Sequence, residues 1–196
     1  MSYVNSLITL WAALGKSRKP PLSECQSDRK LKVIYCVRGV IEPLLAKWLE
    51  HPFFRRRPPK STGRELFGEA FLTPVMAEMK RRSLSKYDII ATLTEFTARS
   101  IVLNYRLHLL NIPHEVILTG GGAANAVLAN AINRELSKLR PDIRVATSAD
   151  HGWPLQTVEA GAFGLLACLR FHDQPGNIPA TTGARQAAVL GQISLP

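Results

Sequence analysis

The stretch that decides the fold is residues 116–125, VILTGGGAAN. A run of apolar residues ends at three consecutive glycines, and an alanine-rich segment follows at once. Glycine loses more backbone freedom on folding than other residues, so three in a row suit neither a helix nor a strand. The stretch is therefore predicted to be a turn between a strand and a helix. Such a turn is either a tight corner or a place where a ligand approaches the bare backbone.

The segments around this turn alternate between helical and strand patterns. Apolar residues spaced three and four apart predict helices over 40–50, 86–110, 127–139 and 158–171. Short apolar runs predict a buried strand over 115–118 and a second strand over 143–146. The order helix, strand, helix, strand, helix predicts an α/β fold with a parallel or mixed sheet covered by helices. The small residues of 158–171 predict close packing of that helix against a neighbour.

Composition limits the class of protein. The chain has 196 residues, which suits roughly one domain, and 46% of them are apolar. No apolar run approaches the ~20 residues of a transmembrane helix, so we expect a cytoplasmic protein that does not enter the membrane. The three cysteines form no CxxC pair and the five histidines no HxxxH pair, so no metal site is expected.

The chain carries a net charge of +10, much of it in residues 16–38 and 55–86. A basic balance is typical of proteins that bind nucleic acid or an anionic partner, but it is also typical of a solvated basic face. No RNP-like motif or interleaved aromatics accompany the charge, so specific nucleic-acid binding is not expected. Residues 1–38 show no sustained period and are predicted to be an atypical, loosely ordered basic segment ahead of one lobe, 39–196.

Three places carry candidate site residues. Gly120, Gly121 and Gly122 precede a helix start, whose free N–H groups favour a phosphate, yet they match neither GxGxxG nor the P-loop pattern. A plain corner and a nucleotide site therefore stay equally open. Glu159 begins an apolar helix, where the helix dipole favours an acid. The same carboxylate could instead face a cleft and orient water, a sugar hydroxyl or Mg²⁺.

The third place is PPKSTGRE, residues 58–65. Lys60 and Arg64 could contact an anion. Ser61 or Thr62 could equally be the N-cap of a helix that begins near Arg64, with Glu65 completing a capping box, and the cap is favoured.

Several segments together resemble the anhydro-N-acetylmuramic acid kinases. They cover about residues 39–193 in the family's order, and the PPKSTGRE run is the most specific: HPFFRRRPPKSTGRELFGEAF, YDIIATLTEFTARSI, VILTGGGAANAVLANAI, HGWPLQTVEAGAFGLLA and PGNIPATTGARQAAVLGQI. The resemblance implies a lobe of the actin-like ATPase and sugar-kinase (ribonuclease H-like) fold. It also implies ATP and Mg²⁺ as cofactors. The implied reaction is phosphorylation of 1,6-anhydro-N-acetylmuramic acid at O6, with water opening the anhydro ring, in amino-sugar and cell-wall recycling.

The resemblance extends to single residues. Gly120, Gly121 and Gly122 match the family's glycine turn on the adenosine side of ATP, with Asn125 in register. Glu159 matches a glutamate near the sugar and the attacking water. Lys60 and Arg64 match family positions that are either substrate contacts or structural residues.

Two family motifs have no counterpart in this sequence. These are the N-terminal phosphate loop, G-T-S-x-D-G, and the glycine–proline–glycine–asparagine motif that precedes the general-base aspartate. The chain is therefore expected to be the kinase's C-terminal lobe, inactive alone, with an N-terminal lobe as partner. An uncovered cleft face would also favour a homodimer. The alternative is a non-catalytic nucleotide-binding or interaction module derived from this kinase.

Overall fold

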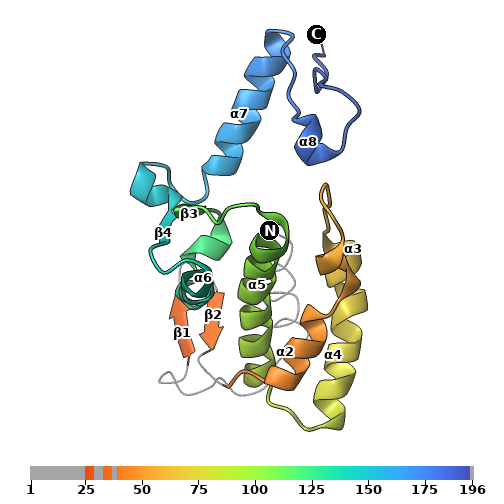
Figure 1. The fold of residues 1–196 in the computed structure, drawn as a ribbon, viewed down its shortest axis with the longest axis vertical. Coiled ribbons are helices and arrows are strands. Elements are labelled where there is room, and N and C mark those ends of the chain that lie inside the picture. The colour runs from red at the N-terminus through yellow and green to blue at the C-terminus, as the bar shows by residue number, and fades with distance from the viewer. Residues whose placement is uncertain (1–24, 29–32, 37–38, 195–196) are drawn as a thin grey trace.

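The computed structural model describes residues 25–28, 33–36 and 39–194 (Figure 1). The described part begins with two short strands and a run of helices, and helices and short strands alternate only from residue 86 onward. The elements in chain order are β1 Cys25–Asp28, β2 Val33–Cys36, α2 Glu42–Leu49, η1 Pro52–Arg55, α3 Arg64–Phe67, α4 Glu69–Arg81, α5 Lys86–His108, β3 Glu115–Leu118, η2 Gly121–Ala124, α6 Ala126–Leu139, β4 Arg144–Thr147, η3 Ser148–His151, α7 Val158–Phe171 and α8 Pro179–Thr182. The four long predicted helices and both predicted strands are confirmed to within a few residues. Helix α4, which contains Pro74, was not predicted from the sequence.

The sheet is smaller than predicted. Strands β3 and β4 pair in parallel, with Glu115 opposite Arg144. Strands β1 and β2 pair antiparallel in a separate sheet, so the strands of the described part do not form one mixed sheet. The prediction that β3 is buried is wrong for most of the strand, because only Val116 is buried and Ile117 is 50% exposed.

Helix α5 is the central element and contributes to two apolar clusters. Its first half packs against α2, η1 and α3, where Trp48, Phe54 and Phe96 make edge-to-face contacts. Its second half packs with β3 and α6 around Val102 and Leu136. Residues 89–98 are buried all round rather than along one stripe. The buried threonines of this half are satisfied locally, since their hydroxyls donate to carbonyls four residues earlier.

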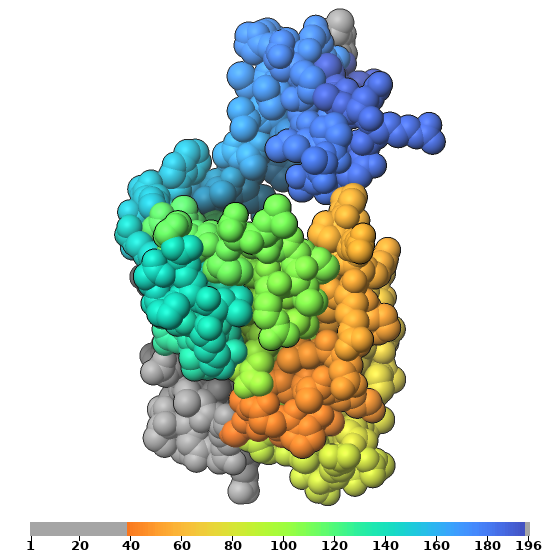
Figure 2. All heavy atoms as spheres, in the orientation of Figure 1, coloured from red at the N-terminus to blue at the C-terminus, as the bar shows by residue number. Residues whose placement is uncertain are grey.

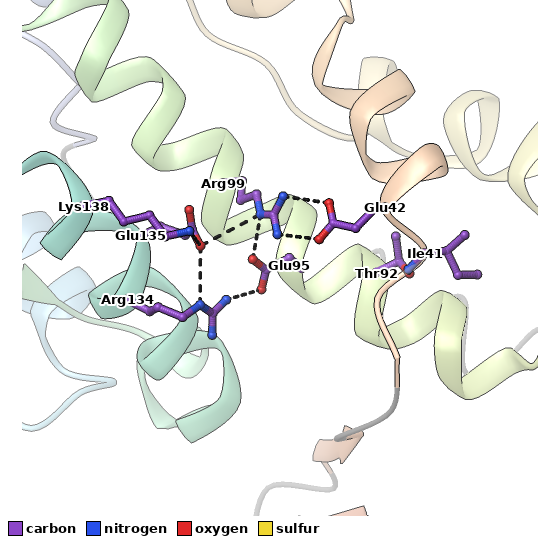
Figure 3. Close-up of polar contacts among 8 residues, drawn as sticks. All are labelled: Ile41, Glu42, Thr92, Glu95, Arg99, Arg134, Glu135 and Lys138. Atoms are coloured by element: carbon purple, nitrogen blue, oxygen red, sulfur yellow. Dashed lines mark hydrogen bonds and ion pairs between the residues drawn. The ribbon is translucent and has the colours of Figure 1, made fainter.

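An ion-pair network joins α2, α5 and α6 (Figure 3). Arg99 donates two hydrogen bonds to the Glu42 carboxylate, at 2.8 and 2.9 Å, and one to Glu95 at 2.8 Å. Arg134 donates to the other oxygen of Glu95. Lys138 donates to Glu135 at 2.6 Å. Burial alone would raise the pKa of Glu95, but the hydrogen bonds from Arg134 and Arg99 outweigh it, and the pKa is lowered.

Helix α7 stands away from the two clusters (Figures 1 and 2). None of its residues is buried, and Phe163 and Leu165 are 66% and 60% exposed. The prediction that its small residues pack closely against a neighbouring element is therefore wrong within the described residues. Gly161 lies against the Trp153 ring, but a side chain at Gly164 would meet nothing within 4 Å.

Most of the predicted basic segment, 1–38, lies outside the described residues, so its loose order stays a prediction. The part that is described forms the β1–β2 hairpin. Within the described chain, no helix combines the length and apolarity that crossing a bilayer would require.

Candidate functional site at the glycine turn

The three glycines form the turn between β3 and α6. Gly120 has φ 77° and ψ −176°, a conformation open essentially to glycine alone. Gly121 and Gly122 begin the 3-10 turn η2, which leads directly into α6. The predicted strand, glycine turn and helix are therefore all present.

Gly120 and Gly121 are glycines for different reasons. The backbone of Gly120 requires glycine because its φ is positive, whereas the φ of Gly121 is not positive. A Cβ atom at Gly121 would also meet nothing within 4 Å. Neither backbone geometry nor internal packing therefore requires a glycine at Gly121, and its bare backbone faces open space.

Donors for an anion or a polar group are available at this turn. No residue of the described chain accepts a hydrogen bond from the N–H of Gly121 or Gly122. The side chain of Asn125 is buried and caps α6, because its Oδ1 accepts a hydrogen bond from the Leu128 N–H at 2.9 Å. This cap fixes the start of the 14-residue helix α6, whose dipole favours negative charge there.

The turn lies where both parallel strands end. The Leu155 carbonyl accepts hydrogen bonds from Gly120 N–H at 2.8 Å and from the Thr119 hydroxyl at 3.1 Å. After β4, the Ser148 hydroxyl lies 3.3 Å from the Thr119 hydroxyl. Ligands of α/β proteins bind at this carboxyl edge of the strands. Sequence reasoning missed Thr119, Ser148 and Leu155, although Thr119 directly follows a predicted strand and Ser148 directly follows β4.

Asp150 stabilises the start of η3, the 3-10 turn that follows β4. Its carboxylate accepts hydrogen bonds from the Thr147 N–H at 2.7 Å and from the Thr147 hydroxyl at 2.8 Å, which makes a capping box for η3. These backbone and side-chain hydrogen bonds lower the pKa of Asp150. Asp150 is therefore committed to local structure.

Glu159 lies in the first turn of α7, as predicted, and is exposed. Its helix begins three residues after Leu155, whose carbonyl holds the glycine turn. Among the described residues its carboxylate forms no hydrogen bond or ion pair, so it is available to an external group.

Lys60 is held by the chain's own carbonyls. Its ammonium donates to the Phe54 carbonyl at 2.8 Å and to the Phe53 carbonyl at 3.2 Å, and it lies 3.1 Å from His108 Nε2. Burial, followed by the charge of Arg56, lowers the pKa of Lys60. These contacts fix η1 against the end of α5.

Arg64 is the first residue of α3 and is exposed, without an ion pair in the described structure. The predicted cap at Ser61 or Thr62 is wrong. Gly63 is the N-cap residue and has no side chain to offer, and only half of a capping box forms, because Glu65 accepts the Gly63 N–H.

The described residues contain no group of three His, Cys, Asp or Glu side chains able to hold a metal ion. In proteins, Mg²⁺ is commonly bound by one or two carboxylates together with substrate phosphates. The described residues therefore supply no dedicated metal centre of their own.

The fold and site define a class: an α/β protein whose parallel strands end at a glycine turn that opens a helix. Comparison with known proteins gives the family. The family model for anhydro-N-acetylmuramic acid kinase matches residues 36–196, and the chain belongs to that family.

Three curated relatives show the extent of the similarity. The chain is 43% identical to anhydro-N-acetylmuramic acid kinase of Cyanothece sp. over 78% of its length, and 43% identical to that of Synechocystis sp. over 79%. It is 40% identical to that of Bacillus cereus over 80%. These alignments cover 39%, 39% and 41% of the respective relatives, so the chain spans about two-fifths of their length.

Proposed function

We propose that this chain is the nucleotide-binding part of an anhydro-N-acetylmuramic acid kinase. In this proposal the chain is a lobe of the actin-like sugar-kinase fold and holds the adenosine end of ATP at Gly120–Gly122. The activity it serves is transfer of a phosphoryl group to O6 of 1,6-anhydro-N-acetylmuramic acid, with water opening the ring, in the cytoplasm. The names of the curated relatives support this activity.

The observation that carries the proposal is the openness of Gly121. Its glycine is required by neither φ nor internal packing, while the N–H groups of Gly121 and Gly122 find no acceptor in the described chain. A planar base or a ribose can approach such a backbone closely, and a side chain would stand in its way. Asn125 contributes by capping α6, which holds the helix start at the turn.

Glu159 has the second role. Its exposed carboxylate opens α7 directly after the segment that holds the glycine turn. A carboxylate in that position can orient the attacking water or a sugar hydroxyl. Arg64 is exposed and unpaired, so it is able to meet an anionic group of the substrate, whereas Lys60 supports η1.

ATP supplies the phosphoryl group and Mg²⁺ neutralises its charge when both are bound. The phosphate loop and general-base aspartate of the family have no counterpart in this sequence. Phosphoryl transfer therefore requires groups that this sequence does not supply, and an N-terminal lobe is the proposed source. The purified chain alone is expected to fall far below the ~1–100 s⁻¹ typical of kinases.

The test compares ATP binding by the wild type, Gly121→Val and Gly164→Val, using calorimetric titration. Gly164 is the matched control, because a Cβ there also meets nothing within 4 Å but lies on α7. We expect Gly121→Val to weaken ATP binding by about tenfold or more, a loss of ~1.4 kcal/mol. Gly164→Val should bind like the wild type.

Two outcomes would contradict the proposal. Equal ATP affinity in all three proteins would show that the glycine turn is not the nucleotide site. An absence of ATP binding in the wild type would favour the non-catalytic interaction module.

A further inference from the structure

A groove runs between α2, α5 and α6, and the kinase proposal does not use it. Its main hollow is about 590 Å³ and has an apolar floor that includes Leu49, Val102 and Leu139. A second hollow of about 530 Å³ continues from it past Pro58 and His108. Arg55 and Leu107 line both hollows, so the two adjoin, and together they are called the groove.

Some of the charged side chains along this groove have ion-pair partners and others have none among the described residues. Arg99 and Lys138 also line it, but the carboxylates of the ion-pair network neutralise them (Figure 3). Arg55, Arg57 and Arg106 are exposed and form no ion pair with any described residue. The groove therefore carries three free guanidinium groups and one free carboxylate, that of the exposed Glu50, above an apolar floor, so its unpaired charge is net positive.

The basic run RRR, residues 55–57, is divided by this geometry. Arg55 and Arg57 line the groove, whereas Arg56 lines neither hollow and acts on Lys60 instead. Arg55 is the last residue of η1, and the chain leaves this 3-10 turn at the C-cap Arg56, where ψ is 138°. The same loop therefore offers a groove-facing pair and a control residue of equal charge.

We propose that this groove docks an acidic, amphipathic helix of a partner protein. Leucine-type anchors of such a helix would meet the floor, and its carboxylates would meet Arg55, Arg57 and Arg106. Charge complementarity selects an acidic partner, because guanidinium groups pair well with carboxylates. Single-stranded nucleic acid fits less well, since no Phe, Tyr or Trp is found among the described lining residues.

The groove is separate from the glycine turn. Glu135, Lys138 and Leu139 line it at the C-terminal end of α6, and the glycine turn lies at the N-terminal end. A 14-residue helix spans roughly 21 Å at 1.5 Å per residue. Docking in the groove can therefore be tested independently of ATP binding.

The experiment measures fluorescence anisotropy with a labelled synthetic helix of about 14 residues, with leucines at i, i+3, i+4 and i+7 and glutamates elsewhere. The full chain is titrated into this probe. We expect Arg55→Ala and Arg106→Ala each to weaken binding by about fivefold, with a larger loss when both are changed. Arg56→Ala should bind the probe like the wild type.

A matched pair of leucine substitutions tests whether the apolar floor contributes to binding. Leu107 is shared by both hollows and is 46% exposed, while Leu110 is 101% exposed and lines neither. Leu107→Asp is expected to weaken binding at least tenfold and Leu110→Asp to leave it unchanged. Both positions are accessible, so neither change should prevent folding, and circular dichroism checks this.

Four outcomes would overturn the proposal. The first is no saturable binding of the acidic probe by the wild type. The second is equal weakening by Arg56→Ala, which would indicate general attraction to a basic surface. The third is equal binding of a probe with serine in place of leucine, which would exclude the apolar floor. The fourth is competition by inorganic phosphate or a single-stranded oligonucleotide as strong as by unlabelled probe, which would name a different ligand class.

Discussion

The N–H of Gly120 donates a hydrogen bond of 2.8 Å to the carbonyl oxygen of Leu155. This bond joins the turn after β3 to the segment that leads into α7, 35 positions later in the chain. The Thr119 hydroxyl donates to the same carbonyl. The glycine turn and the segment that leads to the helix carrying Glu159 are thus held together by one carbonyl group.

Gly120→Ala should test how strongly the turn depends on glycine. At φ 77° and ψ −176° a Cβ is disfavoured, and such strain costs about 1–3 kcal/mol. We expect the free energy of unfolding to fall by that amount, measured by urea denaturation. Gly121→Ala is the control and should change stability by less than about 0.5 kcal/mol, because its position is open. Equal losses in the two variants would contradict this account of the turn.

Asn125→Ala should remove the cap of α6. Replacing a capping asparagine by alanine costs about 0.5–2 kcal/mol, because one N–H at the helix start loses its acceptor. Asn125→Asp retains an acceptor and should keep most of the stability. Asn130→Ala, at an exposed position inside α6, should cost nothing. Thermal unfolding of the three variants checks this, and a loss in Asn130→Ala as large as in Asn125→Ala would show that the loss is not specific to the cap, because alanine is the better helix former at both positions.

The parts of the fold that depend on local pattern could be predicted from the sequence. Three glycines after an apolar run indicate a turn, and the spacing of Leu128, Ile132 and Leu136 indicates a helix. The surroundings of an element could not be predicted. The apolar pattern of α7 is the same whether the helix is buried or not, and Ile117 looks as apolar as Val116. Pairing across elements was also hidden, because Arg99 is 57 positions from Glu42 and Arg134 is 39 from Glu95.

The candidate site divides in the same way. The glycine turn could be predicted from its three consecutive glycines. The role of the Leu155 carbonyl could not, because every residue carries a backbone carbonyl and none is marked in the sequence. Residue type predicts a cap at Ser61 or Thr62, yet Gly63 is the N-cap residue and α3 begins at Arg64. The groove around Arg55 and Leu107 arises only when α2, α5 and α6 come together, so the basic run alone could not indicate it.

The ion-pair network should make stability depend on pH through Glu95. The folded-state pKa of Glu95 is lowered from its ordinary value of 4.5. A carboxylate with a lowered pKa contributes stability fully above the unfolded-state value, and this contribution is lost as the pH falls through the folded-state value. Glu95→Gln should therefore cost about 1–3 kcal/mol at pH 7, because hydrogen-bonded charges are left without a partner. The difference from the wild type should shrink below about pH 4.5.

Urea denaturation at several pH values measures this difference. Glu50→Gln is the control, because Glu50 is exposed and forms no ion pair in the described structure. Its effect should be small at every pH. A Glu95→Gln penalty that stays constant from pH 7 to pH 3 would show that the network stabilises by packing and not by charge.

Helix α7 should tolerate polar substitution. Phe163 and Leu165 are 66% and 60% exposed, so changing both to glutamine removes little buried apolar surface and installs a better helix former than phenylalanine. We expect the free energy of unfolding to change by less than about 0.5 kcal/mol. Phe96→Ala is the contrasting variant: at a position only 1% exposed, it should lower the free energy of unfolding by about 3–5 kcal/mol.

The same double variant tests whether α7 is a contact surface. Exposed apolar surface favours association, so the double variant should also self-associate less in sedimentation equilibrium. A large stability loss in the double variant would mean that α7 packs against part of the chain, and unchanged self-association would mean that α7 is not the contact surface.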